Sequence, residues 1–230
     1  MIGCDVARFG DDFTSIVVRR GGCVLHHETH NGWDTKRTAG RLKELAGAFG
    51  GIGLCGQGGQ SGQGADARRV EVHVDDGGVG GGVVDQADGY RFRAISASER
   101  ALSAEGYPNR RSEMWFVTAA RAAEGRLDLS RLSGESLRLI QRQVMAPTWK
   151  LDSQGRRVVE AKAETKRRIG RSPDDADALN LAFATVPRVE QDDAFYAEYW
   201  GLDERDARWW DGEEGWCDPR LLYAPGTRPR

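Results

Sequence analysis

The chain changes from strand-like to helical patterning within its first 50 residues, and this order restricts the possible folds more than any other feature. Alternating apolar residues or β-branched runs predict strands at 2–6, 14–19 and 23–27. Turn residues separate these segments, so we expect an antiparallel meander. Apolar residues at helical spacing then predict an amphipathic helix over 35–49. A helix that follows such a meander is typical of folds built from α/β layers.

The rest of the chain continues this mixture of strands and helices. Val70, Val72 and Val74 alternate with polar residues and predict a strand that ends at Asp75. Other patterns predict a strand at 91–95, helices at 112–124 and 134–144, and a β-hairpin formed by 148–151 and 157–161. A last helix follows Ser172, which is expected to be its N-cap, with a proline in the first helical position.

Two segments lack the composition of a packed core. Residues 47–64 contain nine glycines among glutamines and serines, which predicts a flexible insertion over 50–66. Helical and strand periodicity fade after Pro187, where an aromatic and acidic stretch begins. We therefore expect one α/β domain over 1–187 and a tail over 188–230.

Length and hydropathy exclude other classes of protein. The chain has 230 residues, enough to bury a core without disulfides, and 39% of them are hydrophobic. No segment approaches the roughly 18 consecutive apolar residues of a membrane span. The N-terminus lacks the basic and apolar regions of a signal peptide. These features predict a cytoplasmic protein without a membrane partner.

Basic residues are concentrated in one part of a chain whose net charge is only -2. Seven of them fall within 156–171, namely Arg156, Arg157, Lys162, Lys166, Arg167, Arg168 and Arg171. Non-specific binding to nucleic acid depends on local contacts with phosphates, so this cluster is the predicted DNA-binding surface. The alternative is a solvated face without a ligand.

Acidic residues occupy three separate positions that strands and a helix can bring together. Asp5 lies on the first predicted strand, and Asp75, or alternatively Asp76, lies at the end of a later one. Asp174 and Asp177 are about 60° apart on one face of the last helix. Clustered carboxylates repel one another unless hard cations such as Mg²⁺ or Mn²⁺ neutralise them. Two such ions about 3.5–4 Å apart catalyse phosphodiester hydrolysis in many nucleases.

Each acidic position also has an ordinary structural interpretation. A single aspartate on a strand can be a hydrogen-bonded structural residue, and aspartates before glycines are common in turns. Acidic residues at a helix start are usually caps, and we assign this role to Asp175, which points away from the Asp174 and Asp177 face.

Four motifs, taken in chain order, resemble those of a known family. They read G-C-D-V-A-R-F-G-D-D-F-T, V-D-D-G-G-V-G-G-G-V-V-D, N-R-R-S-E-M and R-I-G-R-S-P-D-D-A-D-A-L-N-L-A-F. This series is similar to that of the nuclease domain of phage large terminase subunits, which has an RNase H-like fold of the RuvC type. The resemblance covers about residues 1–187.

The resemblance implies a fold, a site and a substrate. The fold would be a mixed five-stranded sheet flanked by helices, with Asp5, Asp75, Asp174 and Asp177 around two Mg²⁺ or Mn²⁺ ions and Asp5 bridging them. The activity would be metal-dependent cleavage of double-stranded DNA during viral genome packaging. The partners would be a terminase ATPase domain, the small terminase subunit and the portal, in the cytoplasm of an infected or prophage-bearing bacterium.

Two other functions are compatible with the same residues. A RuvC-like Holliday junction resolvase would use these carboxylates on branched DNA, and a catalytically silent nucleic-acid-binding module would use them as caps and hydrogen-bond acceptors. The sequence contains no G-x-x-x-x-G-K-[ST] motif, so no ATP site is expected in this chain.

Overall fold

The computed structural model describes residues 1–7, 12–50 and 69–186. Almost all of the predicted glycine-rich insertion over 50–66 and the whole predicted tail over 188–230 lie outside these residues. In the described part, no helix combines the length and the apolar character needed to cross a bilayer.

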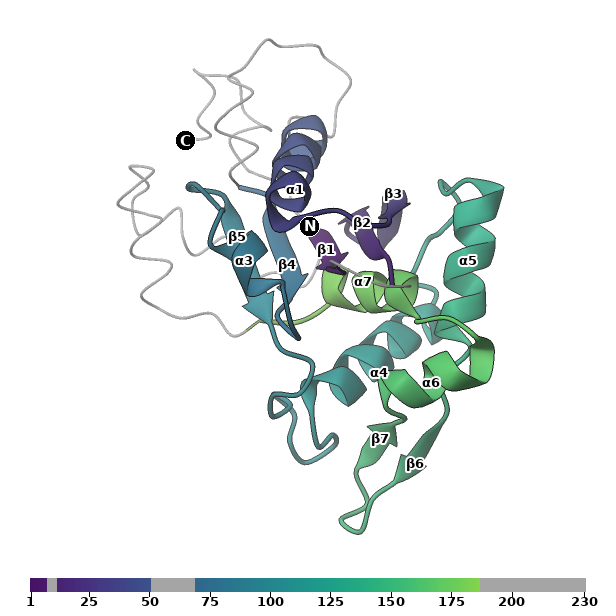
Figure 1. Ribbon diagram of the computed structural model, residues 1–230. Coiled ribbons are helices and arrows are strands. Elements are labelled where there is room, and N and C mark those ends of the chain that lie inside the picture. Colours follow the sequence, from purple (N-terminus) through teal and green to yellow (C-terminus); the bar gives the residue numbers. More distant parts are fainter. Residues whose placement is uncertain (8–11, 51–68, 187–230) are drawn as a thin grey trace, which may run out of the picture. The chain divides into compact units, whose positions relative to one another are not determined.

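A mixed five-stranded sheet forms the centre of the fold, with the strand order β3-β2-β1-β4-β5 (Figure 1). Its strands are β1 (Ile2–Asp5), β2 (Thr14–Arg20), β3 (Cys23–His30), β4 (Glu71–Asp75) and β5 (Arg91–Ile95). The first three are antiparallel, whereas β4 is parallel to both β1 and β5. This sheet confirms the predicted RNase H-like fold class. The parallel strands β1 and β4 both end at one edge of the sheet. Asp5 is the last residue of β1, and Asp75 is the last residue of β4.

Helices cover both faces of the sheet (Figure 1). They are α1 (Thr35–Gly50), α3 (Gly81–Val84), α4 (Arg110–Ala123), α5 (Gly134–Val144), α6 (Lys162–Ile169) and α7 (Asp174–Ala182). The first two pack on one face, and α7 packs on the other against β1, β2 and β4. A β-hairpin of β6 (Trp149–Leu151) and β7 (Arg157–Val159) precedes α6. The predicted strands, helices and hairpin are therefore present.

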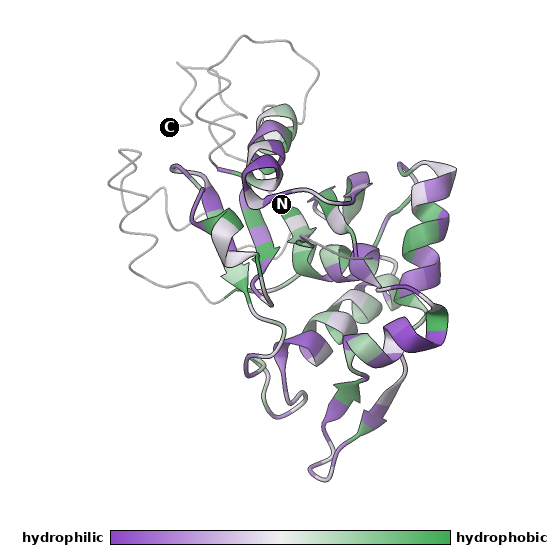
Figure 2. Ribbon diagram, viewed as in Figure 1, coloured by the Kyte–Doolittle hydropathy of each residue, from purple (hydrophilic) through white to green (hydrophobic). Residues whose placement is uncertain are grey.

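Strand alternation divides the apolar residues between two layers. On one side of the sheet, Ile2, Cys4, Val72 and Val74 pack with apolar residues of α1. On the other side, Val17 packs with α5 and with Ala178, Leu179, Ala182 and Phe183 at α7. Figure 2 shows the same division in colour, since β1, β4 and α7 carry much green while α6 is mainly purple. Burial of both apolar layers stabilises α7 against the strands that end in aspartates.

One glycine lets α7 lie directly on β1. A Cβ atom on Gly3 would be only 2.2 Å from the carbonyl oxygen of Ala178 and 2.3 Å from the backbone nitrogen of Ala182. No residue with a side chain fits there without moving the helix or the strand. The two elements that carry Asp5 and the helix aspartates are thus in backbone contact.

Strand β4 is also tied to its neighbours by polar groups. Nδ1 of His73 lies 2.8 Å from the carbonyl oxygen of Leu181 in α7, and Oε1 of Glu71 lies 2.5 Å from Nε of Arg93 in β5. Burial alone would raise the pKa of Glu71, but the hydrogen bond from His73 and the charge of Arg93 lower it to about 2.

The predicted N-cap of α7 is wrong. The helix is capped at Pro173, and the buried hydroxyl of Ser172 has no hydrogen-bond partner among the described residues. A side chain from another helix, Gln143 of α5, takes this role. Its Oε1 accepts hydrogen bonds from the backbone nitrogens of Asp175 at 2.8 Å and Ala176 at 3.1 Å. The local pattern failed because a distant residue satisfies the helix start.

Candidate active site

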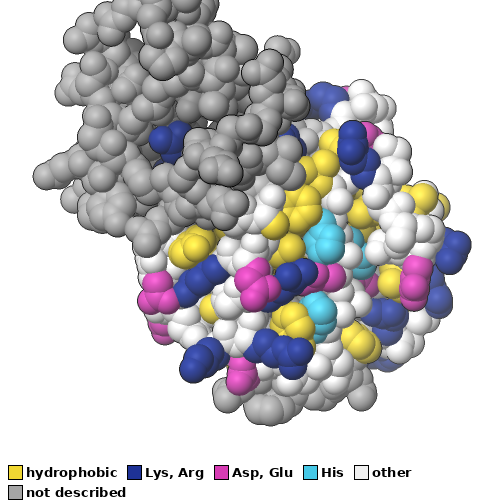
Figure 3. All heavy atoms as spheres, turned by 90° about the horizontal axis from the view of Figure 1, so that it is seen from above, with side chains coloured by type: hydrophobic (Ala, Val, Ile, Leu, Met, Phe, Trp, Pro, Cys, Tyr) yellow, Lys and Arg dark blue, Asp and Glu magenta, His cyan; other side chains and the backbone are white. Residues whose placement is uncertain are grey.

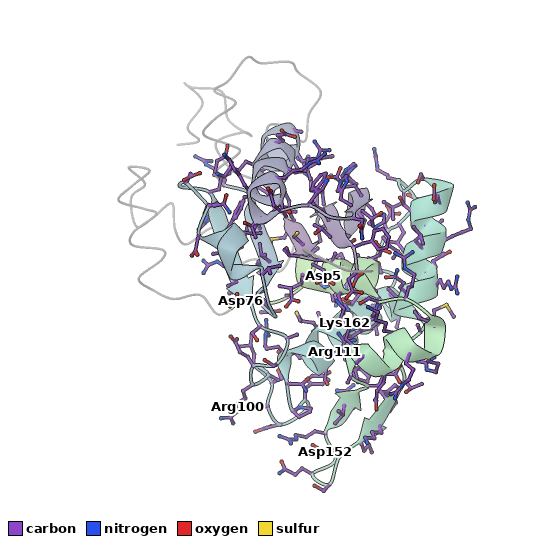
Figure 4. All side chains as sticks on the ribbon, viewed as in Figure 1. Asp5, Asp76, Arg100, Arg111, Asp152 and Lys162 are labelled. Atoms are coloured by element: carbon purple, nitrogen blue, oxygen red, sulfur yellow. The ribbon has the colours of Figure 1, made fainter. Side chains whose placement is uncertain are left out.

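Three aspartates from distant parts of the chain meet around one lysine. Nζ of Lys162, the first residue of α6, lies 2.6 Å from Oδ2 of Asp5, 3.0 Å from Oδ1 of Asp174 and 3.2 Å from Oδ2 of Asp177. Figure 4 shows Asp5, Lys162 and Arg111 close together in the middle of the view, with Asp76, Arg100 and Asp152 apart from them. We call Asp5, Asp174, Asp177 and Lys162 the carboxylate cluster.

Local geometry explains why these three carboxylates face one another. Asp5 is the last residue of β1, and alternation turns it away from Cys4 toward the α7 side of the sheet. Asp174 and Asp177 are three residues apart in the first turn of α7, so both project from the same face. Asp5 is only 3% exposed and Asp174 only 2%. The structure therefore brings together Asp5, Asp174 and Asp177, as the sequence predicted.

Each helix aspartate has one oxygen held by the protein and the other directed at Lys162. Oδ2 of Asp174 accepts a hydrogen bond from the backbone nitrogen of Phe13 at 3.0 Å. Oδ1 of Asp177 accepts from Nη1 of Arg111 at 2.9 Å and from Nε1 of Trp115 at 3.2 Å. Oδ2 of Asp177 is buried and has no hydrogen-bond partner among the described residues, although Lys162 lies near it. These anchors restrict the carboxylate rotamers and leave the second oxygen of each aspartate facing Lys162.

Asp75 and Asp76 occupy different environments at the end of β4. Alternation puts Asp75 on the same side of the strand as His73, toward α7, and its Oδ1 accepts from the backbone nitrogen of Gly77 at 3.2 Å. Asp76 is exposed, and its backbone nitrogen donates to the carbonyl oxygen of Ile95. Of the two candidates, Asp75 is the one on the cluster side of the sheet.

The cluster has an excess of negative charge. Burial raises the pKa of Asp5 well above its usual range, Lys162 opposes this shift, and the charges of Asp177, Asp174 and Asp75 add to it. Burial likewise raises the pKa of Asp75. For Lys162, burial would lower the pKa, but Asp5, Asp177 and Asp174 outweigh it and raise the pKa well above the usual value. Lys162 and Arg111 carry two positive charges against the four carboxylates of Asp5, Asp75, Asp174 and Asp177, so the site favours further positive charge.

Asp175 is not the helix cap that the sequence suggested. It is fully buried and points into the space between β2, β3 and α5. Its Oδ1 accepts from Oγ of Ser15 at 2.9 Å and from Nε2 of His27 at 2.9 Å, while its Oδ2 accepts from Nε2 of Gln143 at 2.5 Å. Burial opposes ionisation, but the hydrogen bond and charge of His27 hold the pKa of Asp175 below its usual value. Asp175 therefore ties the first turn of α7 to three neighbouring elements.

The structure distributes the seven basic residues of the predicted DNA-binding cluster among different partners. Lys162 lies inside the carboxylate cluster, whereas the sequence interpretation grouped it with the phosphate contacts. Arg157 stacks against the rings of Tyr107 and Phe116. The other five make ion pairs: Arg156 with Asp152, Lys166 with Asp12, Arg167 with Glu164, Arg168 with Glu160, and Arg171 with Asp175. Arg167, whose side chain is 77% exposed, is the most accessible of these five residues.

The sequence analysis did not place Lys162, Arg111 or Gln143 in the framework of the site. Lys162 looked like one member of a basic run, and Gln143 looked like an ordinary helix residue. The motif N-R-R-S-E-M contains Arg111 and was the available signal for that residue.

The donor chemistry of the cluster suits a hard divalent cation. Among residues 1–7, 12–50 and 69–186, no three His, Cys, Asp or Glu side chains are arranged to hold a metal ion as they stand. The ammonium group of Lys162 lies between the carboxylates of Asp5, Asp174 and Asp177. The possible ligands are all carboxylate oxygens, which Mg²⁺ and Mn²⁺ prefer. One of them, Oδ2 of Asp177, has no hydrogen-bond partner among the described residues, and the ammonium group of Lys162 already lies among these oxygens.

Comparison with solved structures identifies the fold. The nuclease domain of the large terminase subunit gp2 of bacterial virus Sf6 matches with a TM-score of 0.62 and 18% sequence identity, over 81% of this chain and 88% of that chain. The chain has the fold of a large-terminase nuclease domain. The large terminase nuclease of thermophilic phage G20c matches with a TM-score of 0.53 and 17% identity, over 81% of each chain.

A third terminase nuclease shows the same likeness. The nuclease domain from Thermus phage P74-26 matches with a TM-score of 0.51 and 16% identity, over 79% of this chain and 76% of that chain. A scan against protein-family models and a search of curated proteins both found no match. The likeness to terminase nucleases therefore rests on three-dimensional structure and on the four sequence motifs.

Proposed function

We propose that this chain is a metal-dependent endonuclease that hydrolyses phosphodiester bonds of double-stranded DNA during viral genome packaging. The observation that carries the proposal is the carboxylate cluster, in which Asp5, Asp174 and Asp177 surround the ammonium group of Lys162. Asp75 lies at the end of the neighbouring parallel strand, on the same side of the sheet. The cluster lies on a fold shared with terminase nucleases.

Solved relatives support a divalent metal as cofactor. The Sf6 nuclease domain is described with manganese and, in another structure, with calcium. The G20c nuclease is described with bound magnesium and with bound cobalt. We extend this to two Mg²⁺ or Mn²⁺ ions in the present chain, held by Asp5, Asp75, Asp174 and Asp177, with Asp5 between them. When bound, such ions activate a water molecule and stabilise the leaving oxygen.

Neighbouring residues orient the carboxylates of this site, and Lys162 supplies donors for a phosphate oxygen. Arg111 and Trp115 hold Asp177, and the backbone of Phe13 holds Asp174, so these carboxylates keep their orientation as the charge around them changes. Lys162 keeps a proton on Nζ and neutralises part of the cluster. Its three N–H donors are also suited to orient a phosphate oxygen once the carboxylates have another partner.

The DNA-binding surface in this proposal includes the basic residues of α6 and its flanks. Arg156, Arg157, Lys166, Arg167, Arg168 and Arg171 follow or precede Lys162 in the chain. Phosphate contacts of this kind position a duplex without reading its sequence. In the infected or prophage-bearing host, the partners proposed for this nuclease are a terminase ATPase domain, the small terminase subunit and the portal.

Cleavage assays on three DNA substrates test the proposal. Linear duplex, supercoiled plasmid and four-way junction DNA are each incubated with the chain and Mg²⁺, Mn²⁺ or EDTA. The proposal predicts that linear and supercoiled duplexes are cut with either metal and remain intact with EDTA. Selective cutting of the junction would favour a RuvC-like resolvase instead. Binding without cutting under every condition would favour a silent binding module.

A further inference from the structure

A charged hollow lies beside the first turns of α1, outside the carboxylate cluster. Its volume is about 580 Å³, and it is lined by Trp33, Asp34, Lys36, Arg37, Arg41 and Glu44. We call it the α1 hollow. Figure 3 views the molecule from the end at which α1 lies in Figure 1, and basic and histidine side chains adjoin hydrophobic ones on this face.

The α1 hollow contains two cationic groups without an acidic partner. Arg41 is neutralised, because it pairs with Glu28 and with Glu44. Asp34 is used as a helix cap, since its Oδ1 accepts from the backbone nitrogen of Arg37 at 2.7 Å. Lys36 and Arg37 are exposed, and neither makes an ion pair with any residue in the described part of the chain. Their charge is therefore available to a ligand.

An aromatic stack holds Arg37 in place. The Trp33 ring stacks on His30 with centroids 3.5 Å apart, and the guanidinium of Arg37 lies 4.5 Å from the Trp33 ring centroid. A guanidinium that stacks on an aromatic face keeps its N–H donors in its own plane, where they can bind phosphate oxygens in pairs. The stack also reduces the rotamer entropy that Arg37 would lose on binding.

The α1 hollow borders the edge of the sheet at which Asp5 lies, from the face opposite α7. In the strand register, Ser15 lies opposite Asp5, and His30 lies opposite the neighbouring Thr14. Adjacent strands are about 4.8 Å apart, so His30 lies roughly 10 Å from the end of β1. The Trp33 ring, which lines the hollow, stacks on His30.

Contacts near the start of α1 lead toward α6 on one side and toward α3 on the other. Nδ2 of Asn31 donates to the carbonyl oxygen of Asp12, and the Asp12 carboxylate pairs with Lys166 of α6. On the other side, a Cβ on Gly82 in α3 would be 3.4 Å from the side chain of Thr35, and α3 follows Asp75 by a short turn. The start of α1 thus borders the edge on which the carboxylates lie.

We propose that the α1 hollow binds the phosphate backbone of the duplex whose scissile bond lies at the carboxylate cluster. Lys36 and Arg37 are the contact residues, and Trp33 is a positioning residue that orients Arg37. The inference rests on the proposed nuclease function and adds to it a second phosphate contact, separate from the basic residues of α6. Since it involves charge and not base edges, binding here is independent of DNA sequence.

Salt-dependent binding of the full chain to duplex DNA tests this inference. Affinities for two unrelated duplexes are measured by fluorescence anisotropy with Ca²⁺ at several salt concentrations, for the parent and for a Lys36→Gln/Arg37→Gln variant. Each lost phosphate contact should reduce the slope of log K against log salt by about 0.9, so the variant slope should be lower by about one to two units. In cleavage assays the variant should show a higher KM with an unchanged kcat, because the carboxylates are intact.

Two control variants separate charge from structure. Lys36→Arg/Arg37→Lys keeps both charges and should retain the parent slope. Arg126→Ala/Arg131→Ala removes two arginines near Asp128, whose backbone pairs with β3 at the opposite edge of the sheet, and should also retain it.

An unchanged slope for Lys36→Gln/Arg37→Gln, together with normal cleavage by the parent, would overturn the inference and leave the proposed function standing. Loss of binding to only one of the two duplexes would also overturn it, because that result indicates base readout. A parent chain that neither binds nor cuts any duplex would overturn both.

Discussion

The side-chain nitrogen of Lys162 lies 2.6 Å from Oδ2 of Asp5, although the two residues are 157 positions apart in the chain. The lysine also reaches Asp174 and Asp177, so a single ammonium group links the first strand of the sheet to the last helix. In charge and position it resembles a bound cation. We therefore expect a metal ion and the ammonium group of Lys162 to compete for this site.

Replacing Lys162 tests this competition. In Lys162→Met the carboxylates lose their counter-charge, so the metal-free chain should unfold at a lower temperature than the parent. Mg²⁺ or Mn²⁺ should then raise the unfolding temperature by more than it does in the parent, since no ammonium group must be displaced. Thermal unfolding with EDTA and with each metal measures both effects. Lys150→Met, on the exposed strand β6, is the control, and an equal metal-induced shift in parent and Lys162→Met would contradict the idea.

Asp5→Asn should abolish most of the nuclease activity while the fold is retained. Asparagine has nearly the same shape but lacks the charge that a bridging metal ligand provides, so cleavage should fall by orders of magnitude. Asp174→Asn and Asp177→Asn should also impair cleavage through weaker metal binding. Cleavage rates and circular dichroism are measured side by side. The matched control is Asp85→Asn, an exposed position, and normal cleavage by Asp5→Asn would reject the proposed site.

Asp75 and Asp76 provide a paired test of strand alternation. Asp75 lies on the α7 side of β4 and Asp76 is exposed. Asp75→Asn should therefore reduce cleavage much more than Asp76→Asn, measured at limiting Mn²⁺. If Asp76→Asn reduced cleavage more than Asp75→Asn, the fourth carboxylate of the site would be Asp76 and not Asp75.

Gln143→Leu should destabilise the start of α7 and weaken metal binding at a distance. The substitution leaves two backbone N–H groups of α7 and the Asp175 carboxylate without their partner, at a cost of about 1–3 kcal/mol. Because the same helix turn carries Asp174 and Asp177, the Mg²⁺ concentration for half-maximal cleavage should rise. Ser133→Ala, which removes the N-cap of α5, is a control of similar stability cost, about 1 kcal/mol. Equal metal dependence in both variants would show that Gln143 has only a structural role.

The environment of Glu71 should make the chain less stable in acid. Despite burial, the hydrogen bond from His73 and the charge of Arg93 hold the pKa of Glu71 at about 2 in the folded chain, below its ordinary value of 4.5, so the ionised Glu71 carboxylate contributes fully above about pH 5. Its contribution, on the order of 1–3 kcal/mol, should disappear as the pH falls toward 2. Urea unfolding between pH 6 and pH 3 should show a flatter pH dependence for Glu71→Gln than for the parent. Glu124→Gln, in an exposed pair with Arg126, should change little.

Patterns within single strands and helices predicted the features that depend only on neighbouring residues in the chain. Alternation along 2–6 turned Asp5 away from the side of Ile2 and Val6, and helical spacing grouped Asp174 with Asp177. Both were predictable because a side chain's direction follows from its position within one strand or helix. The mixed sheet itself came from the resemblance of the motifs.

Long-range partners were not predictable in this way. Ser172 and Asp175 have the sequence of a local cap, yet the helix start is satisfied by Gln143 and the Asp175 carboxylate by Ser15 and His27. These partners are between 32 and 160 positions away from Asp175 in the chain. The position of Lys162 was not predictable for the same reason, because two of the carboxylates around it belong to β1 and α7, distant from α6 in the chain.

The contact of α7 with β1 at Gly3 determines how the carboxylate cluster can change. With no side chain between the two backbones, the separation of Asp5 from the helix aspartates is set by van der Waals contact of backbone atoms and not by the packing of interchangeable apolar residues. A core substitution elsewhere can be absorbed by small shifts of its neighbours, whereas any residue larger than glycine at this position must move a whole helix. We therefore expect tolerance to mutation to be lowest at Gly3. This residue is uncharged, makes no hydrogen bond to the site, touches no substrate and takes no part in the chemistry.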